Sequence, residues 1–410
     1  MAPSTTRIAL VLSGGGARGA YEAGALAYLF EELPARLGRP VHFDIVTGTS
    51  VGAVHACFVG ASRQGPDTAN RLTGIWRSLS LGTVYQLGLA DVVRIPWRLA
   101  GFGSHEVDET TARVPGVLDT AWLRALVMDR VHWHGLRQNL DLGTLSAIAV
   151  TTTEVASGTS VVFVDHAPGV TVTEGSDPFV HYRAGRIGPR HALASAAIPL
   201  LFPAIRIDDE LHCDGGLRLN TPLAPALHLG ATHVLVIGLR HAGSTHPDAA
   251  RKHEREGNAM NPTYLMGKVL NALLLDRVET DLERLRLFNG ILERGTEVYG
   301  PDFVARINEP IVERRGRPYR IVKNFHLSPS EDLGRVASEC LEQAPRGGGL
   351  RQRLSRQLAR YAALGAIGEA DLLSYLYFDR TFTDRLVEIG RRDARDAADD
   401  LVAFFESAGP

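Results

Sequence analysis

One serine in this sequence lies between two glycines in a pattern that can make it a nucleophile. Ser50 is the centre of the stretch GTSVG, Gly48 to Gly52, which follows the apolar run VHFDI. In a G-x-S-x-G turn the flanking glycines permit a sharp strand-to-helix turn that projects the serine oxygen. The following helix would supply backbone N–H groups and a positive dipole end for developing negative charge. The alternative is an ordinary tight turn.

A glycine-rich loop near the start of the chain allows two interpretations. Gly14, Gly16 and Gly19 spell G-x-G-x-x-G after an apolar run, which is the dinucleotide-binding fingerprint. That fingerprint expects an acidic residue at the end of the second strand, whereas here Thr47 and the GTSVG turn stand there and Asp44 lies inside the strand. The other interpretation is a set of N–H donors that faces the serine and forms an oxyanion hole.

The elements around both motifs predict a parallel sheet. RIALVLS reads as a buried strand, GGGARG as a turn and AYEAGALAYLFEEL as a helix; VHFDIVTG and VGAVHACFVGA repeat the strand and helix. This β-α-β-α order is typical of an α/β protein with parallel strands. Ser50 is therefore expected at the carboxyl end of a strand.

The remaining chain indicates more sheet and then helices. LSAIAVTTTEV and TSVVFVDH predict a hairpin or adjacent strands, TPLAPALHLGA a helix and THVLVIGL a buried strand. Residues 81–118 show no clean period and predict an irregular or short-helical insertion, in which Trp97 and Phe102 are lid candidates. The polar run 241–258 predicts a loop, and a helix is expected from Pro262 to Asn289.

Composition excludes some classes of function. A net charge of −2 and a pI of about 6.7 give no basic field for nucleic acid. Three widely separated cysteines do not suit a disulfide framework and favour a reducing compartment. The longest uncharged stretch, residues 219–239, is broken by Pro222, Pro225 and Gly230 and is a poor membrane span. We expect a soluble cytoplasmic protein, for which a peripheral membrane contact stays open.

Four motifs together resemble the patatin-like phospholipases, in the order in which that family carries them. They are the loop GGGARG, the elbow GTSVG, the stretch ASAAIPLLFP from Ala194 to Pro203, and the triplet Asp214-Gly215-Gly216. The resemblance covers about residues 6–240, and two later helical stretches look like bacterial members. It implies hydrolysis of acyl esters of phospholipids or lysophospholipids, without metal or organic cofactor.

The resemblance also implies the roles of individual residues. Ser50 would be the nucleophile and Asp214 its base, without a histidine. The implied oxyanion loop consists of Gly14, Gly15, Gly16, Arg18 and Gly19. The Arg18 side chain could bind a lipid phosphate or form a salt bridge.

The sequence thus predicts an α/β fold with a central, mainly parallel sheet and helices on both faces. Residues 1–330 would form the acyl hydrolase domain, and residues 331–410 a helical C-terminal extension. Two alternatives stay open. One is a Rossmann-type dinucleotide-binding protein, and the other is a Ser-Asp-His triad in which His241, after the strand THVLVIGL, takes the proton.

Overall fold

The computed structural model describes residues 6–80, 84, 121–172, 179–199, 202–241, 278–315, 317–343 and 371–409. The lid candidates Trp97 and Phe102 lie outside these residues, as does the predicted 241–258 loop beyond His241. The helix expected from Pro262 is described only from Val278 onward.

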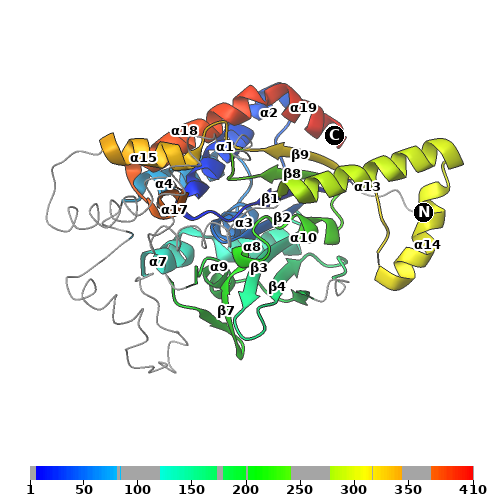
Figure 1. The fold of residues 1–410 in the computed structure, drawn as a ribbon, viewed down its shortest axis with the longest axis horizontal. Helices are drawn as coiled ribbons and strands as arrows, with labels where there is room; N and C mark the ends of the chain where they lie inside the picture. Colours follow the sequence, from blue (N-terminus) through cyan, green and yellow to red (C-terminus); the bar gives the residue numbers. More distant parts are fainter. Residues whose placement is uncertain are drawn as a thin grey trace, which may run out of the picture.

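The described strands form one mixed sheet that is mostly parallel (Figure 1). Its main path has the order β5-β4-β3-β2-β1-β8-β9, and β7 pairs with β3 and with β6. The strands are β1 Ile8–Leu12, β2 Ile45–Thr49, β3 Ala147–Glu154, β4 Ser160–His166, β5 Val180–Ala184, β6 Ile205–Ile207, β7 Glu210–Asp214, β8 His233–Ile237 and β9 Lys323–Leu327. The predicted adjacent strands are confirmed, because β3 and β4 pair antiparallel. The predicted parallel core is confirmed in β3-β2-β1-β8-β9.

Helices cover both faces of this sheet, because the central strand is apolar on both sides. Along β1, Leu10 and Leu12 belong to a large core that includes α1 and α3, whereas Ala9 and Val11 belong to a second core with α10 and α13. Strands buried on both faces read as continuous apolar runs, which is how the IALVL stretch appears in the sequence.

The described helices fall into two groups along the chain. Those of the first 230 residues are η1 Gly16–Arg18, α1 Gly19–Glu31, α2 Leu33–Leu37, α3 Val51–Gly60, α4 Pro66–Ser78, α7 Ala121–Arg130, α8 Trp133–Asp141, α9 Pro189–Ser195, η2 Gly215–Leu217 and α10 Leu223–His228. Those of the later chain are α13 Val278–Tyr299, α14 Phe303–Arg315, α15 Leu333–Gln343, α17 Asp371–Leu376, α18 Arg380–Asp396 and α19 Ala398–Glu406. Among the residues described, no helix has the length and apolar character needed to cross a bilayer.

The C-terminal region is helical, as predicted, and it packs directly on the first helix. Figure 1 shows α18 (red) lying along α1 (blue). The two backbones approach closely at glycines: a Cβ at Gly24 would lie 2.0 Å from the Val387 carbonyl oxygen, and one at Gly390 would lie 2.1 Å from the Tyr21 oxygen. Arg391, which follows Gly390, forms ion pairs with Glu31 and Glu32 at the C-terminal end of α1. The helices of the C-terminal region therefore share one core with α1.

Candidate active site

Ser50 occupies a strained turn at the carboxyl end of β2. Its φ of 55° and ψ of −125° lie where side chains are rarely tolerated, directly before α3. The turn requires both flanking glycines, since a Cβ at Gly48 would lie 2.1 Å from the Gly52 oxygen and one at Gly52 would lie 2.4 Å from the Leu12 oxygen. The predicted elbow, with Gly48 and Gly52 beside the serine, is thus present as a backbone geometry.

Asp214 lies within hydrogen-bond distance of Ser50, although 164 residues separate them. The Ser50 hydroxyl donates to Asp214 Oδ2 at 2.6 Å. Antiparallel pairing places Asp214, the last residue of β7, opposite Thr152 of β3, and β3 is the neighbour of β2. The sheet therefore brings together the two side chains to which the sequence assigned catalysis.

The surroundings of Asp214 favour a neutral carboxyl more than water does. The residue is fully buried, and its Oδ1 accepts the Gly216 N–H at 2.7 Å. Burial raises the pKa of Asp214 from 3.8 to about 7, although the hydrogen bonds from Ser50 and Gly216 act in the opposite direction. A carboxylate with a raised pKa is a stronger base than an exposed aspartate.

The glycine loop lies against Ser50 from the end of β1. A Cβ at Gly14 would be 3.1 Å from the Ser50 Cβ. The Gly14 N–H donates to the Asn220 backbone oxygen at 3.0 Å, and the Asn220 side-chain amide donates back to the Gly14 oxygen at 3.1 Å. Gly16 has a φ of 55°, and Gly19 begins α1. The predicted loop glycines thus lie from the end of β1 to the first residue of α1, at the serine end of the sheet.

Arg18, the remaining predicted member of this loop, turns toward the C-terminal region. Its side chain is only 6% exposed, and its Nε–H donates to the Ser374 hydroxyl at 2.7 Å. Its guanidinium carbon lies 4.2 Å from the centre of the Tyr375 ring. The planar face of the guanidinium is therefore occupied by an aromatic ring of α17.

Two residues of the site carried no role in the sequence interpretation. Ser195 accepts the Ser50 N–H at 2.9 Å and donates its own hydroxyl proton to the Thr151 oxygen at 2.6 Å. Asn220 holds both backbone groups of Gly14, as described above. Ser195 stands within the ASAAIPLLFP motif, which was its only sequence signal, and Asn220 had none.

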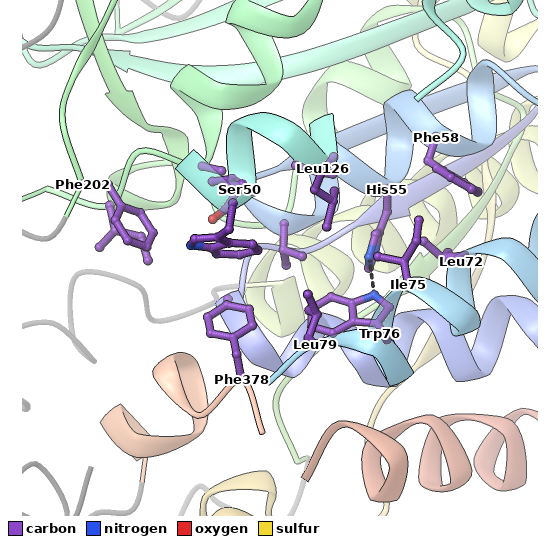
Figure 2. A pocket seen from close by; sticks show the side chains of 17 residues that line it. Ser50, His55, Phe58, Leu72, Ile75, Trp76, Leu79, Leu126, Phe202 and Phe378 are labelled. Carbon is purple, nitrogen blue, oxygen red and sulfur yellow. Dashed lines mark hydrogen bonds between the residues drawn. The ribbon is translucent and has the colours of Figure 1, made fainter. Parts of the chain in front are cut away.

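An apolar cavity lies beside Ser50, which is one of its lining residues. Figure 2 shows Ser50 and Phe202 toward one end and Phe58 and Leu72 toward the other, with Trp76 and Phe378 along one wall. Further lining residues are Val51, Val54, Ile75, Leu79, Trp122, Leu123, Leu126 and Ile198. A cavity lined this way suits a hydrocarbon chain.

The cavity histidine His55 and the triad candidate His241 form hydrogen bonds with residues other than Ser50 and Asp214. His55 lines the cavity, but its Nε2 accepts from the Trp76 indole at 2.9 Å and its Nδ1 pairs with Glu22 at 2.7 Å. Burial lowers the pKa of His55 to about 3, so the ring is neutral. His241 bonds through Nδ1 to the Pro329 oxygen at 2.9 Å. Within the described part of the chain, no histidine hydrogen-bonds to Ser50 or Asp214.

A comparison with known families decides what this arrangement belongs to. The model of the family described as patatin-like phospholipase matches residues 10–227, more than half of the chain. The chain belongs to the patatin-like phospholipase family. Both residues of the Ser50–Asp214 pair lie within the matched range, and so do the glycine loop and Asn220.

Named relatives of this patatin-like phospholipase chain are themselves phospholipases. A cGAMP-activated phospholipase of Pseudomonas aeruginosa is 30% identical over 58% of this chain and 63% of its own length. A calcium-independent phospholipase A2-gamma of Rattus norvegicus is 28% identical over 53% of this chain and 25% of its own length. The chain thus spans less than two thirds of either relative. The crystal structure of VipD from Legionella pneumophila aligns over 96% of this chain and 67% of its own, with 13% identity and a TM-score of 0.36, too low to carry an argument.

Proposed function

We propose that this chain hydrolyses acyl esters of phospholipids or lysophospholipids, with Ser50 as nucleophile and Asp214 as general base. The observation that carries the proposal is the 2.6 Å hydrogen bond from Ser50 to Asp214 beside an apolar cavity that Ser50 lines. A hydroxyl on a strained elbow, bonded to a buried carboxylate, is the arrangement that nucleophilic catalysis needs. The family and the names of its relatives support the lipid substrate.

In the proposed first step, Ser50 Oγ attacks the ester carbonyl while its proton moves to Asp214 Oδ2. Prior loss of the serine proton is too costly, because ~10 pKa units between a hydroxyl and an ordinary carboxylic acid correspond to about 14 kcal/mol. Raising the pKa of Asp214 to about 7 removes about 4 kcal/mol of this difference. The transfer therefore accompanies the attack.

The negative charge that forms on the carbonyl oxygen would be stabilised by the glycine loop. The Gly14 N–H is already bonded to Asn220, so we assign the donors to the next amides, Gly15 and Gly16. Each such donor can contribute about 3 kcal/mol in the transition state. In this scheme Gly14 and Gly19 shape the loop, and Arg18 contributes from its buried contacts rather than as a donor.

The reaction then proceeds in two stages, which are release of the alcohol or lysolipid and hydrolysis of acyl-Ser50. When the tetrahedral intermediate collapses, the ester C–O bond breaks and Asp214 returns its proton to the departing alcohol or lysolipid. Water next attacks acyl-Ser50 and gives a proton to Asp214. The second collapse releases the fatty acid, and Ser50 regains its proton from Asp214.

The geometry favours this function over dinucleotide binding. In the fingerprint the glycines leave space for a pyrophosphate. Here a Cβ at Gly14 would meet the Asn220 side chain at 2.2 Å, and one at Gly16 would meet the Tyr375 oxygen at 2.3 Å. Protein atoms therefore occupy the space beside Gly14 and Gly16 that a pyrophosphate would need. Mass spectrometry of the purified protein for a bound nucleotide tests this alternative.

We further propose a cytoplasmic location with peripheral contact to membrane lipid. All three cysteines are buried and unpaired, which fits a reducing compartment. A phospholipid substrate would be reached at a membrane surface. Fractionation of cells that produce the tagged protein, with a salt wash of the membrane fraction, tests this part of the proposal.

A fluorophosphonate probe tests the nucleophile directly. Ser50 should be labelled rapidly, since the reagent requires an activated hydroxyl. Ser50→Ala should abolish the label, and Ser13→Ala is the control because Ser13 is another buried serine whose hydroxyl lies 2.6 Å from that of Thr221. Labelling that persists in Ser50→Ala would refute the assignment. Incubation with a mixed lipid extract, with products read by mass spectrometry, then identifies the substrate.

A further inference from the structure

Helix α17 and the residues after it contact the proposed oxyanion loop, although they lie outside the residues that the family model matches. The contact is made by Leu373 to Phe378, which we call the 373–378 segment. It contains the end of α17 and the two residues that follow. Its side chains are buried or nearly so, which indicates a fixed position.

The first contact is between side chains. Arg18 donates from Nε to the Ser374 hydroxyl at 2.7 Å, and its guanidinium lies over the Tyr375 ring. The Arg18 Nη1 also lies 3.4 Å from the Tyr375 hydroxyl. A planar guanidinium held by both a hydrogen bond and a ring face has little freedom to move.

The second contact is between backbones. Gly16, two residues before Arg18, has its Cα against the Tyr375 carbonyl, so that a Cβ there would lie 2.3 Å from the oxygen. Gly16 supplies one of the amides that we assign to the oxyanion hole. The 373–378 segment therefore touches the loop on both sides of Ala17.

The third contact is with the cavity. Phe378 lines the cavity beside Ser50 and stacks on Trp76 with ring centres 6.2 Å apart (Figure 2). The centre of the Trp122 ring lies 5.3 Å from that of Phe378. Tyr377 packs on Phe382 at the start of α18, which anchors the segment from behind. One short stretch thus supports the loop and forms a wall of the cavity.

We propose that the 373–378 segment is part of the active site, in which Arg18 is a positioning residue and Phe378 shapes the acyl site. The inference depends on the proposed function of Ser50 and the glycine loop. Oxyanion donors must lie within a few tenths of an ångström of their best position. The contacts of Ser374 and Tyr375 keep the glycine loop in that geometry. Without these contacts the donors would move from their best position, while the cavity would still bind lipid.

The test compares two substitutions at one position. Tyr375→Leu removes the ring face under Arg18, whereas Tyr375→Phe keeps it. With a neutral short-chain ester, we expect Tyr375→Leu to lower kcat about 10- to 100-fold with little change in KM, because transition-state stabilisation alone is lost. Tyr375→Phe should restore most of kcat. Ser374→Ala should also lower kcat, because it removes the hydroxyl that accepts from Arg18.

Arg391→Ala is the matched control, because Arg391 also ties the C-terminal region to α1 but at the end far from the loop. It should lower the melting temperature and leave kcat unchanged. Hydrogen exchange of a peptide covering residues 13–19 gives a readout independent of catalysis. Exchange there should rise in Tyr375→Leu and stay unchanged in Arg391→Ala.

Two outcomes would overturn the proposal. If Tyr375→Leu lost stability but kept both kcat and loop protection, the segment would be a structural support only. The same holds if Tyr375→Phe lost as much kcat as Tyr375→Leu. Failure of the wild-type protein to be labelled at Ser50 is a different result, which refutes the proposed function, while the exchange measurement still reports on the loop contact.

Discussion

Replacing Asp214 by asparagine should strongly lower hydrolysis and yet stabilise the protein at alkaline pH. The carboxylate is fully buried, and its pKa in the folded protein is about 7 against an ordinary value of 3.8. The folded state therefore holds a proton that the unfolded state releases, so stability falls as the pH rises from 3.8 to about 7. Across that whole interval the loss is about 4 kcal/mol, at about 1.36 kcal/mol for each pH unit.

Asparagine imitates the protonated form of the side chain and stays neutral at every pH. Its oxygen can still accept the Gly216 N–H, and its amide can donate to Ser50. Between pH 5.5 and 8.5 the wild type loses about 2 kcal/mol through Asp214 and the variant loses none, because the folded carboxyl ionises near pH 7. The stability of Asp214→Asn relative to wild type should therefore rise by about 2 kcal/mol over that range.

Urea unfolding at the two pH values, followed by fluorescence, measures this difference. The comparison is repeated in the Ser50→Ala background, where the hydrogen bond that lowers the pKa of Asp214 is absent and the pH-dependent difference should grow. Esterase activity should fall by ~10² to 10⁴ in Asp214→Asn, and wild-type kcat should decline below pH 7 as the base is protonated. A stability difference that is the same at both pH values would refute a raised pKa at Asp214.

Four further substitutions test separate parts of the site. His241→Ala should keep most esterase activity, because its ring bonds to the Pro329 backbone oxygen and not to Ser50 or Asp214; loss of hydrolysis in a folded His241→Ala would favour a triad. Gly52→Ala should lower the melting temperature markedly or prevent folding, since the new Cβ has no room, and a melting temperature like that of wild type would contradict the elbow geometry. Ser195→Ala should lower kcat about 10-fold by releasing the Ser50 backbone, whereas an unchanged kcat would make Ser195 dispensable. Leu72→Trp should shift hydrolysis toward shorter acyl chains in a mixed-ester assay, and an unchanged product distribution would place the acyl chain elsewhere.

The parts of this molecule that the sequence predicted are those with a local signal. The strand before Ser50, the elbow glycines and the parallel pairing of β1 with β2 follow from apolar runs and glycine spacing. Asp214 carried only a common turn pattern, and its role rested on the family resemblance. Its place beside Ser50 depends on the antiparallel pairing of β7 with β3, which no local pattern indicates.

The residues that sequence reasoning missed act through contacts distant in the chain. Ser195 and Asn220 are ordinary polar residues until the sheet places them against Ser50 and Gly14. The Arg18 side chain forms a hydrogen bond to Ser374 that spans 356 positions, which no local pattern indicates. Its predicted role at a lipid phosphate or in a salt bridge stays a prediction. The predicted division at residue 330 stays a prediction.

The close approach of α1 and α18 has a consequence for biosynthesis. Gly24 leaves the ribosome 366 residues before Gly390, the difference between the two positions. At about 5–20 residues per second, the face of α1 that α18 covers waits about 20–70 s for its partner. During translation this apolar helix is exposed to chaperones and to other nascent chains. The yield of folded protein in a host cell should therefore depend on the supply of chaperones, although this face of α1 is fully covered in the folded protein.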